Sequence, residues 1–344
     1  RTLAAENLFF ALNGPHFDGH DWLAQAHARG AAAAVVARPM EAPLALLQVA
    51  DTRLALGELA RHWRTHFAIP VVGVTGSNGK TTVKEMLTAI LAQRGEVLAT
   101  KGNLNNDIGV PLTLARLGAE HRSAVIEMGA NHLREIAYLV DLARPTVGII
   151  TNAGPAHLEG FGSLDGVARG KGELFAGLPL DATAVINADD RFADLWRGLA
   201  QGRKQVTFGL QNDADVHGTY SAQAQGSAIR MHTPQGDVNV LLPLPGRHNV
   251  LNALGATAAA RAAGADLADV KAGLESLGGV SGRLQRKTRA DGGVVLDDTY
   301  NANPASMRAA IDVLRELPGE SWLVLGDMGE LGGDAAQLHA EIGA

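Results

Sequence analysis

The fold of this chain is decided by the stretch Val71-Val72-Gly73-Val74-Thr75-Gly76-Ser77-Asn78-Gly79-Lys80-Thr81-Thr82. Its apolar first half predicts a buried strand, and the pattern from Lys80 to Gln93 predicts a helix directly after the glycine-containing turn. The first N–H groups of such a helix, together with the helix dipole, attract anions. The stretch therefore predicts a phosphate-binding loop at the end of a strand in an α/β domain.

The residues of this loop can be given separate roles. Lys80 would reach the β- and γ-phosphates of a nucleotide, and the Thr81 hydroxyl would ligate Mg²⁺. The usual pattern has a further glycine where Val74 stands, so the match is to the shorter Gly-x-x-Gly-Lys-Thr form. A glycine-rich turn with a solvated lysine is the alternative, which the order strand, loop, helix disfavours. The loop alone distinguishes neither ATP from GTP nor one reaction from another. We expect the nucleotide contacts to come from Thr75, Gly76, Ser77, Asn78, Gly79, Lys80, Thr81 and Thr82.

The composition is that of a globular protein with two or three domains. The 344 residues are 46% hydrophobic and 19% charged. A net charge of −6 gives no electrostatic footprint for nucleic acid, although local loops can still bind small anions. The absence of cysteine excludes a disulfide scaffold and thiol catalysis. No apolar run approaches the about 20 residues of a membrane span, and residues 1–4 lack a signal-peptide pattern, so we expect a cytoplasmic protein.

Three regions follow one another along the chain. Residues 1–68 contain short apolar runs and alanine-rich helical stretches, and in residues 69–288 strands alternate with helices. That alternation predicts a parallel sheet with helices on both faces, and the short alternating runs between about 205 and 242 predict an antiparallel hairpin insert. Residues 289–344 predict the beginning of a second α/β domain. We expect strands there at 294–296 and 322–325, and a helix that starts at Pro304 with Asn303 as its cap.

Polar residues stand where strands of the central region end, which is where ligands of α/β sheets bind. Glu127 follows an apolar strand and can hold a divalent cation, while His157 follows the strand at 147–150 and is an unusual ligand for Mg²⁺. A capping carboxylate and a satisfied loop histidine are the alternatives for these two residues. Lys171 lies in a helical pattern, and its residue type alone indicates a solvated charge.

The chain resembles a known family, the Mur ligases, over nearly its whole length. The segments Asn-Leu-Asn-Asn at 103–106 and Tyr-Asn-Ala-Asn-Pro at 300–304 are similar to the branch that ligates D-alanyl-D-alanine. So many matches in the same order make chance improbable. The segments that carry the resemblance are TGSNGKT at 75–81, GNLNNDIGVP at 102–111, EMGANH at 127–132, TNAGPAHLEGF at 151–161, LPGRHNVLNA at 244–253, DDTYNANP at 297–304 and LGDMGELG at 325–332.

The resemblance implies three domains. Residues 1–68 would bind the UDP end of the substrate, residues 69–288 would bind ATP, and residues 289–344 would begin a Rossmann-like domain that closes over the site. Family members start a little before Arg1 and continue for about a hundred residues after Ala344, if domain sizes are typical. We therefore expect the start of the first domain and much of the closing domain to lie outside this sequence.

The resemblance also implies roles for single residues. Glu127 and His157 look like Mg²⁺ ligands, and Lys171 matches the lysine that family members carbamylate, which reverses its charge and lets it face the metal. Arg283 looks like a contact to the γ-phosphate. Asn252 would contact adenine and Asp298 the ribose, and the residues expected to face the substrate are Asn103, Asn105, Asn106 and Asn301. The catalytic group would then be Lys80, His157, Lys171 and Arg283.

The implied reaction activates a carboxylate as an acyl phosphate and joins it to an amine, with UDP-N-acetylmuramoyl-tripeptide and D-alanyl-D-alanine as substrates and ATP and Mg²⁺ as cofactors. We expect a monomer. A related ligase that adds a single amino acid, including a folylpolyglutamate synthase, is the alternative within this class. A nucleotide switch without ligase activity and a simple kinase are alternatives from other classes. The switch predicts hydrolysis that needs no amine, and the kinase predicts a stable phosphorylated product.

Overall fold

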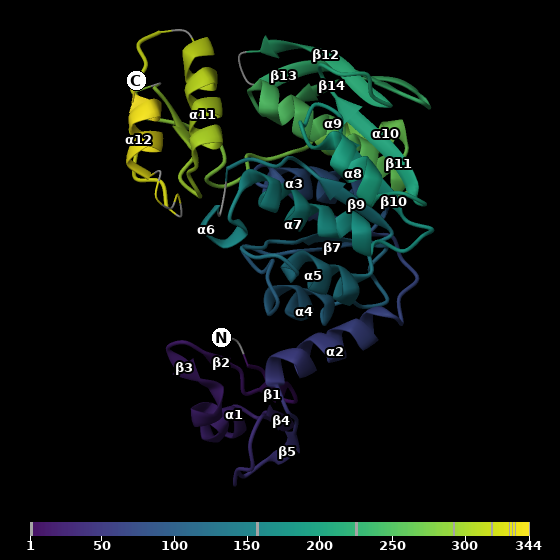
Figure 1. The fold of residues 1–344 in the computed structure, drawn as a ribbon, viewed down its shortest axis with the longest axis vertical. Coiled ribbons are helices and arrows are strands. Elements are labelled where there is room, and N and C mark those ends of the chain that lie inside the picture. Colours follow the sequence, from purple (N-terminus) through teal and green to yellow (C-terminus); the bar gives the residue numbers. More distant parts are fainter. Residues whose placement is uncertain are drawn as a thin grey trace.

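The computed structural model describes residues 3–155, 158–223, 226–291, 293–317, 319–329, 331, 333 and 335–343. Figure 1 shows a small N-terminal region at the bottom, a large central region above it, and a C-terminal region beside the upper part of the central one. The mixed α/β architecture with one large, mainly parallel sheet confirms the predicted fold class.

The N-terminal region contains a three-stranded parallel sheet in the order β1-β4-β5. Its strands are β1 Leu8–Phe10, β4 Ala33–Val36 and β5 Ala45–Gln48; the remaining elements are the hairpin β2 Asn13–Gly14 with β3 Phe17–Asp18, η1 Gly19–Trp22 and α1 Leu23–Ala28. Helix α2, Thr52–Arg64, leads away from this sheet to the central region, as Figure 1 shows. The Arg64 guanidinium donates to the carbonyl of Ala143, so the end of α2 is fastened to the central region.

The central sheet has nine strands in the order β14-β13-β12-β11-β10-β9-β6-β8-β7. The strands are β6 Val71–Thr75, β7 Val97–Ala99, β8 Ser123–Glu127, β9 Val147–Ile150, β10 Thr183–Asn187, β11 Lys204–Gly209, β12 Val216–Gln223, β13 Gly226–Thr233 and β14 Gly236–Leu242. Pairing is parallel from β7 to β12, and only β12–β13 and β13–β14 are antiparallel. The predicted antiparallel insert therefore starts later than expected, at β12 and β13, because β11 pairs in parallel with both β10 and the start of β12.

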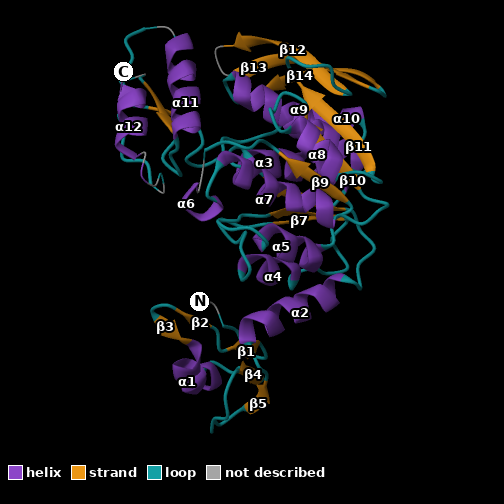
Figure 2. Ribbon diagram, viewed as in Figure 1, coloured by secondary structure: helices purple, strands orange, loops and turns teal. Residues whose placement is uncertain are grey.

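Helices cover both faces of this sheet, as Figure 2 shows. One face packs against α3, α9 and α10, and the other against α2, α4, α5, α7 and α8. All five residues of β6 are buried, as expected for a central parallel strand. The helices are α3 Lys80–Leu91, α4 Gly109–Leu114, α5 Glu135–Ala143, α6 Leu158–Phe161, α7 Leu164–Gly177, α8 Ala193–Leu199, α9 Arg247–Ala262 and α10 Leu267–Glu275, with the short η2 Ala92–Arg94.

The C-terminal region starts with an antiparallel pair, β15 Gln285–Thr288 and β16 Val294–Asp297. Helix α11, Pro304–Glu316, begins at the predicted cap, since the Asn303 side chain accepts from the N–H of Ser306 and Ser306 returns a bond. Helix α12 is Ala335–Gly343.

The strand predicted at 322–325 is wrong. No described strand pairs with this segment, and Trp322 and Val324 are 82% and 92% exposed. An apolar run becomes a strand only where a neighbouring strand pairs with it through backbone hydrogen bonds. Within the described residues, no helix has the length and apolar character to cross a membrane.

Candidate active site

The loop after β6 needs its two glycines for conformation and for space. Gly76 and Gly79 have φ angles of 144° and 81°, which side chains disfavour. A Cβ atom at Gly76 would lie 1.9 Å from Thr151 Oγ1, and one at Gly79 would lie 2.5 Å from Asn252 Oδ1. The predicted adenine contact Asn252, on α9, is therefore packed against the start of α3.

The segment after β9 holds this loop in place. Asn78 N–H donates to Asn152 Oδ1 over 3.0 Å, and Thr151 Oγ1 donates to the Asn78 carbonyl over 2.6 Å. Gly154 N–H donates to Ser77 Oγ over 2.9 Å. Because two neighbouring strands supply both partners, the loop shape is set before any nucleotide binds.

Lys80 lies curled over the loop. Its Nζ donates to the carbonyls of Gly76 and Ser77 over 2.7 and 3.1 Å. Burial lowers the pKa of Lys80, Glu127 opposes this effect and Arg283 adds to it. The ammonium thus lies at the phosphate loop itself.

Glu127 is the last residue of β8 and is only 2% exposed. Its partner in the sheet register is Val74, one residue before the phosphate loop begins. Its Oε1 accepts from Asn105 Nδ2 over 2.9 Å, whereas Oε2 is buried without a hydrogen-bond partner among the described residues. An unpartnered buried carboxylate oxygen beside a phosphate loop is suited to a cation.

Lys171 is buried, at 1% exposure, which contradicts a solvated helix lysine. Its Nζ donates to the Ala130 carbonyl over 3.1 Å and lies 5.1 Å from the centre of the Phe161 ring. Burial, followed by the nearby Lys80, lowers the pKa of Lys171 to about 7. A large share of this amine is therefore uncharged and nucleophilic near neutral pH.

Arg283, in the segment that joins the central and C-terminal regions, contacts the phosphate loop. Its Nη2 donates to Thr81 Oγ1 over 3.4 Å, and its guanidinium stacks 4.4 Å from the centre of the Tyr300 ring. Asp298 accepts from the N–H of Leu284 over 3.0 Å, and burial raises the pKa of its carboxyl group. The predicted γ-phosphate contact is thus next to the predicted Mg²⁺ ligand Thr81.

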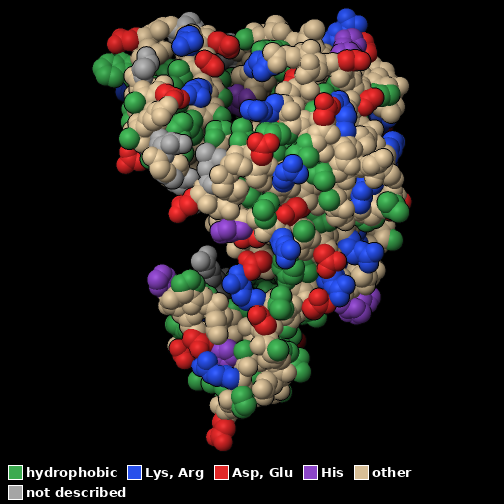
Figure 3. Space-filling view, in the orientation of Figure 1, with side chains coloured by type: hydrophobic (Ala, Val, Ile, Leu, Met, Phe, Trp, Pro, Cys, Tyr) green, Lys and Arg blue, Asp and Glu red, His purple; other side chains and the backbone are tan. Residues whose placement is uncertain are grey.

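A cavity of about 690 Å³ lies where the three regions meet. Figure 3 shows the molecule hollowed on one side between the N-terminal region and the rest, with charged side chains beside the hollow. Its lining contains eight of the predicted site residues: Lys80, Asn103, Asn105, Asn106, Glu127, Lys171, Arg283 and Asn301. The other lining residues were not predicted as site residues: Arg53, Leu54, Asp107, Gly129, Ala130, Asn131, Leu133, Arg134, Glu135, Tyr138, Leu139 and Tyr300.

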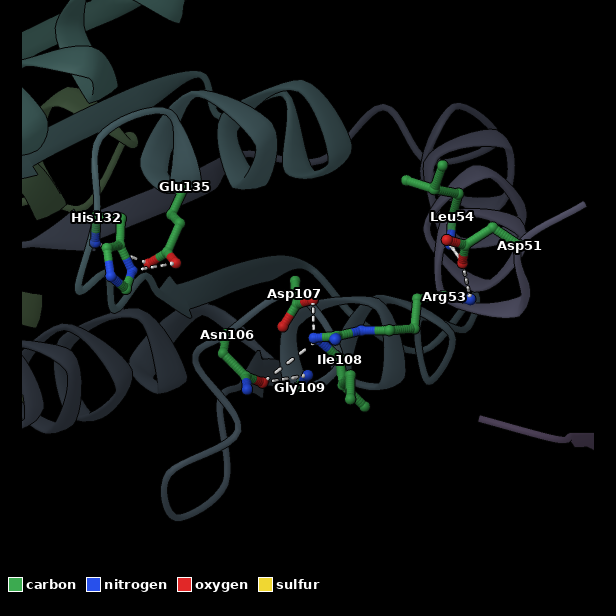
Figure 4. Close-up of polar contacts among 9 residues, drawn as sticks. All are labelled: Asp51, Arg53, Leu54, Asn106, Asp107, Ile108, Gly109, His132 and Glu135. Carbon is green, nitrogen blue, oxygen red and sulfur yellow. Dashed lines mark hydrogen bonds and ion pairs between the residues drawn. The ribbon is translucent and has the colours of Figure 1, made fainter. Parts of the chain in front are cut away.

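Several of these unidentified residues give no signal in a sequence, because charged residues on helix surfaces are common. Arg53 of α2 forms an ion pair with Asp107, which joins the N-terminal region to the loop before α4 (Figure 4). Asn106 Oδ1 accepts from the N–H of Gly109, the first residue of α4, so this predicted substrate residue also holds the start of that helix. The second predicted metal ligand, His157, lies outside the described residues. Among the described residues, no three His, Cys, Asp or Glu side chains cluster in a way that could hold a metal.

Comparisons with known proteins agree with this arrangement. Residues 74–260 match the family model described as Mur ligase middle domain, and residues 282–344 match the one described as Mur ligase, glutamate ligase domain. The chain is 50% identical over its whole length to the UDP-N-acetylmuramoyl-tripeptide–D-alanyl-D-alanine ligase of Escherichia coli K12, of which it covers 76%.

Two solved structures share the fold. One is the UDP-N-acetylmuramoylalanyl-D-glutamyl-2,6-diaminopimelate–D-alanyl-D-alanyl ligase of Acinetobacter baumannii, with a TM-score of 0.91 and 43% identity over 99% of this chain and 75% of that one. The other is the MurF ligase of Thermotoga maritima in complex with ADP, with a TM-score of 0.88 and 31% identity over 99% of this chain and 79% of that one. Given the phosphate loop, the shared architecture and these matches, the chain belongs to the Mur ligase family.

Proposed function

We propose that this chain ligates D-alanyl-D-alanine to UDP-N-acetylmuramoyl-tripeptide with ATP, forming ADP and phosphate, in the synthesis of peptidoglycan precursors. The observation that carries the proposal is a single cavity in which the phosphate-loop Lys80, the buried Glu127 and Lys171, and Arg283 of the segment before β15 converge. The high identity to the E. coli ligase supports the choice of substrates.

The chemistry follows from the charges in this cavity. The acceptor's terminal carboxylate oxygen attacks the γ-phosphorus of ATP, the bond to the β-phosphate oxygen breaks, and an acyl phosphate and ADP result. The amine of D-alanyl-D-alanine then attacks the acyl carbon, and the tetrahedral intermediate expels phosphate and loses a proton. Lys80 and Arg283 offset the charge of the transferring phosphoryl group, and most of the catalysis is positioning.

The described residues fit a Mg²⁺ ion in part. Glu127 Oε2 is a buried oxygen without a partner, and Thr81 offers a hydroxyl oxygen, both of the hard type that Mg²⁺ prefers. We propose Thr81, Glu127, a carbamate on Lys171, and His157 as its ligands. When bound, the ion supplies charge neutralisation for the phosphates.

Further assignments remain proposals of the same kind. We propose that Asn252 contacts adenine and Asp298 the ribose, and that Asn103, Asn105, Asn106 and Asn301 face the substrate. The division into 1–68 for the UDP substrate, 69–288 for ATP and 289–344 for closure stays a prediction. The pairing of β15 with β16 favours a second boundary before Gln285, because a hairpin folds as one unit. A cytoplasmic monomer that binds no nucleic acid also remains a prediction.

One assay tests the ligase against its alternatives. ADP release is measured with ATP, UDP-N-acetylmuramoyl-tripeptide and either D-alanyl-D-alanine or single amino acids, and the product mass is determined. We expect ADP release only with the dipeptide, and a product heavier by that dipeptide less one water. ADP release without any amine would favour a nucleotide switch, a phosphorylated end product would favour a kinase, and turnover with a single amino acid would favour a related ligase.

A further inference from the structure

The cavity between the three regions holds more basic than acidic groups. Its lining contains five basic and three acidic side chains, which are Arg53, Lys80, Arg134, Lys171 and Arg283 against Asp107, Glu127 and Glu135. Cationic side chains in a concave site attract anionic ligands, and four of the five remain cationic when Lys171 carries the proposed carbamate. The contacts that each of these side chains already makes indicate which cation could bind such a ligand.

The acids are already engaged. Asp107 pairs with Arg53, and Glu135 accepts from the N–H groups of Asn131 and His132 and from the His132 ring, as Figure 4 shows for the two side-chain pairs. Glu127 uses one oxygen for Asn105. None of the three forms an ion pair with Arg134 among the described residues, although Glu127 acts electrostatically on Lys80 and Glu135 on Lys171.

Four of the five cations are also engaged. Arg53 pairs with Asp107, and Lys80 donates to carbonyls of the phosphate loop. Lys171 donates to the carbonyl of Ala130, and Arg283 donates to Thr81. The guanidinium of Arg134 has no hydrogen bond or ion pair with any residue in the described part of the chain. Arg134 is thus the cation of this lining whose side chain makes no such contact in the described part of the chain, whereas Lys80 and Arg283 lie at the phosphate loop.

The backbone at Arg134 is held in an unfavourable conformation. Its φ angle is +73°, in the left-handed region that favours glycine. Glu173 of α7 fixes this conformation: its two carboxylate oxygens accept from the N–H of Arg134 over 2.6 Å and from the N–H of Ala137 over 3.1 Å. Helix α7 therefore carries both Lys171 and the carboxylate that holds the backbone of Arg134. Strain retained in this way at a ligand cavity indicates a function.

We propose that Arg134 binds a carboxylate of the acceptor peptide that takes no part in the reaction, and so selects peptides that carry one. This inference rests on the proposed function. The reacting carboxylate must meet the γ-phosphate near Lys80, whereas Arg134 lines the same cavity from the start of α5, outside the phosphate loop. A guanidinium fork matches a carboxylate with two parallel hydrogen bonds.

Two parts of the acceptor can supply this carboxylate. The name of the A. baumannii ligase contains both a glutamyl and a 2,6-diaminopimelate residue, and each derives from a dicarboxylic acid. After one carboxyl of each has been used, for a peptide bond or for the reaction, a second one remains. Both sources share the same recognition chemistry, and the experiment distinguishes them.

The first experiment measures the dissociation constants of UDP-N-acetylmuramoyl-tripeptide and of ATP by calorimetry. We expect Arg134→Gln to weaken peptide binding about 10- to 100-fold, the loss typical of a hydrogen bond to a charged group, and Arg134→Lys to fall between this variant and the wild type. ATP binding should not change. Arg144→Gln is the matched control, since Arg144 also has a positive φ angle, at the other end of α5, and does not line the cavity.

A second experiment excludes a purely structural role. Glycine adopts a positive φ without strain, so Arg134→Gly should raise the Tm while it weakens peptide binding as Arg134→Gln does. Weaker binding together with a lower Tm in every Arg134 variant would overturn the proposal, as would unchanged binding.

The source of the carboxylate follows from altered acceptors. One acceptor carries the amide of its glutamyl carboxylate, and another carries lysine in place of diaminopimelate. The acceptor that lacks the recognised carboxylate should bind the wild type more weakly than the natural acceptor does. Its affinity should not fall further when Arg134 is replaced by Gln. Equal losses in wild type and variant with both acceptors would overturn the proposal. If the wild type bound no UDP-N-acetylmuramoyl-tripeptide at all, the proposed function itself would fail.

Discussion

The side chain of Asn303 donates a hydrogen bond of 2.6 Å from its Nδ2 to Oδ1 of Asn78. Asn303 caps α11 in the C-terminal region, and Asn78 lies in the phosphate loop of the central region. The main chain of Asn78 is fully occupied by Thr151 and Asn152, so its side chain is free to make this contact. One residue therefore both starts a helix and fastens its region to the nucleotide loop.

The two roles of Asn303 can be separated by substitution. Asn303→Ser keeps a capping oxygen but is too short to reach Asn78, whereas Asn303→Ala loses both contacts. We expect Asn303→Ala to lower the free energy of unfolding by about 1 kcal/mol and Asn303→Ser to change it little. In both variants, hydrogen exchange at residues 276–284, which join the two regions, should become faster. Unchanged exchange would show that the contact does not restrain the C-terminal region.

Lys80→Ala should abolish ligation without unfolding the protein. Lys80 contacts only loop carbonyls in the described structure, so its loss leaves the fold intact but removes the cation expected at the β- and γ-phosphates. We expect the turnover number to fall at least about 100-fold, as for other electrostatic stabilisers. Steady-state kinetics and circular dichroism test this, with the exposed Lys204→Ala as control. Normal turnover of Lys80→Ala would refute the role.

Lys171 should make stability depend on pH. Its pKa is about 7 in the folded protein and 10.5 in the reference state, so between these values the unfolded chain binds more protons than the folded one. Stability relative to Lys171→Met should therefore rise with pH from about 7 to about 10, with a slope of up to about 1.4 kcal/mol per pH unit, and should be flat below pH 7. Urea unfolding in buffers free of carbon dioxide measures the difference. A flat profile throughout would contradict the assigned burial of a free amine.

The carbamate on Lys171 has its own test. Lys171→Ala should lose most activity, and added short carboxylates should restore part of it, because they can occupy the position of the carbamate. Wild-type activity should also increase with bicarbonate, since the uncharged amine reacts with carbon dioxide. Lys204→Ala serves again as the control. If Lys171→Ala kept full activity, the carbamate would have no role in turnover.

Glu127→Gln should separate metal binding from stability. The substitution removes a buried charge whose Oε2 has no partner in the described structure, while the amide oxygen can still accept from Asn105. We therefore expect an unchanged or higher Tm together with a large increase in the Mg²⁺ concentration needed for half-maximal ATP turnover. Glu120→Gln, at an exposed residue away from the cavity, is the matched control. A Mg²⁺ dependence equal to that of the wild type would remove Glu127 from the metal site.

Local sequence patterns were sufficient for the elements around the nucleotide loop. The apolar strand at 71–75, the helix from Lys80 and the cap at Asn303 were predicted because each depends on neighbours within a few residues. The segment at 322–325 was predicted wrongly because a strand depends on a partner elsewhere in the chain. The same limit applied to β11. It was predicted as part of an antiparallel insert, but it pairs in parallel with β10 on one side and with β12 on the other.

The sequence by itself determined that a phosphate loop follows the first central strand and that Glu127 ends a neighbouring strand. Only the tertiary structure decided that Lys171 is buried beside them, since burial depends on Ala130 and Phe161 from other elements. Only the tertiary structure, too, left the guanidinium of Arg134 without a partner among the described residues while Glu173 of another helix holds its backbone. The spacing of apolar residues in a sequence indicates which face of a helix or strand is buried. Which charged side chains form pairs depends on which helices and strands pack together in the folded chain.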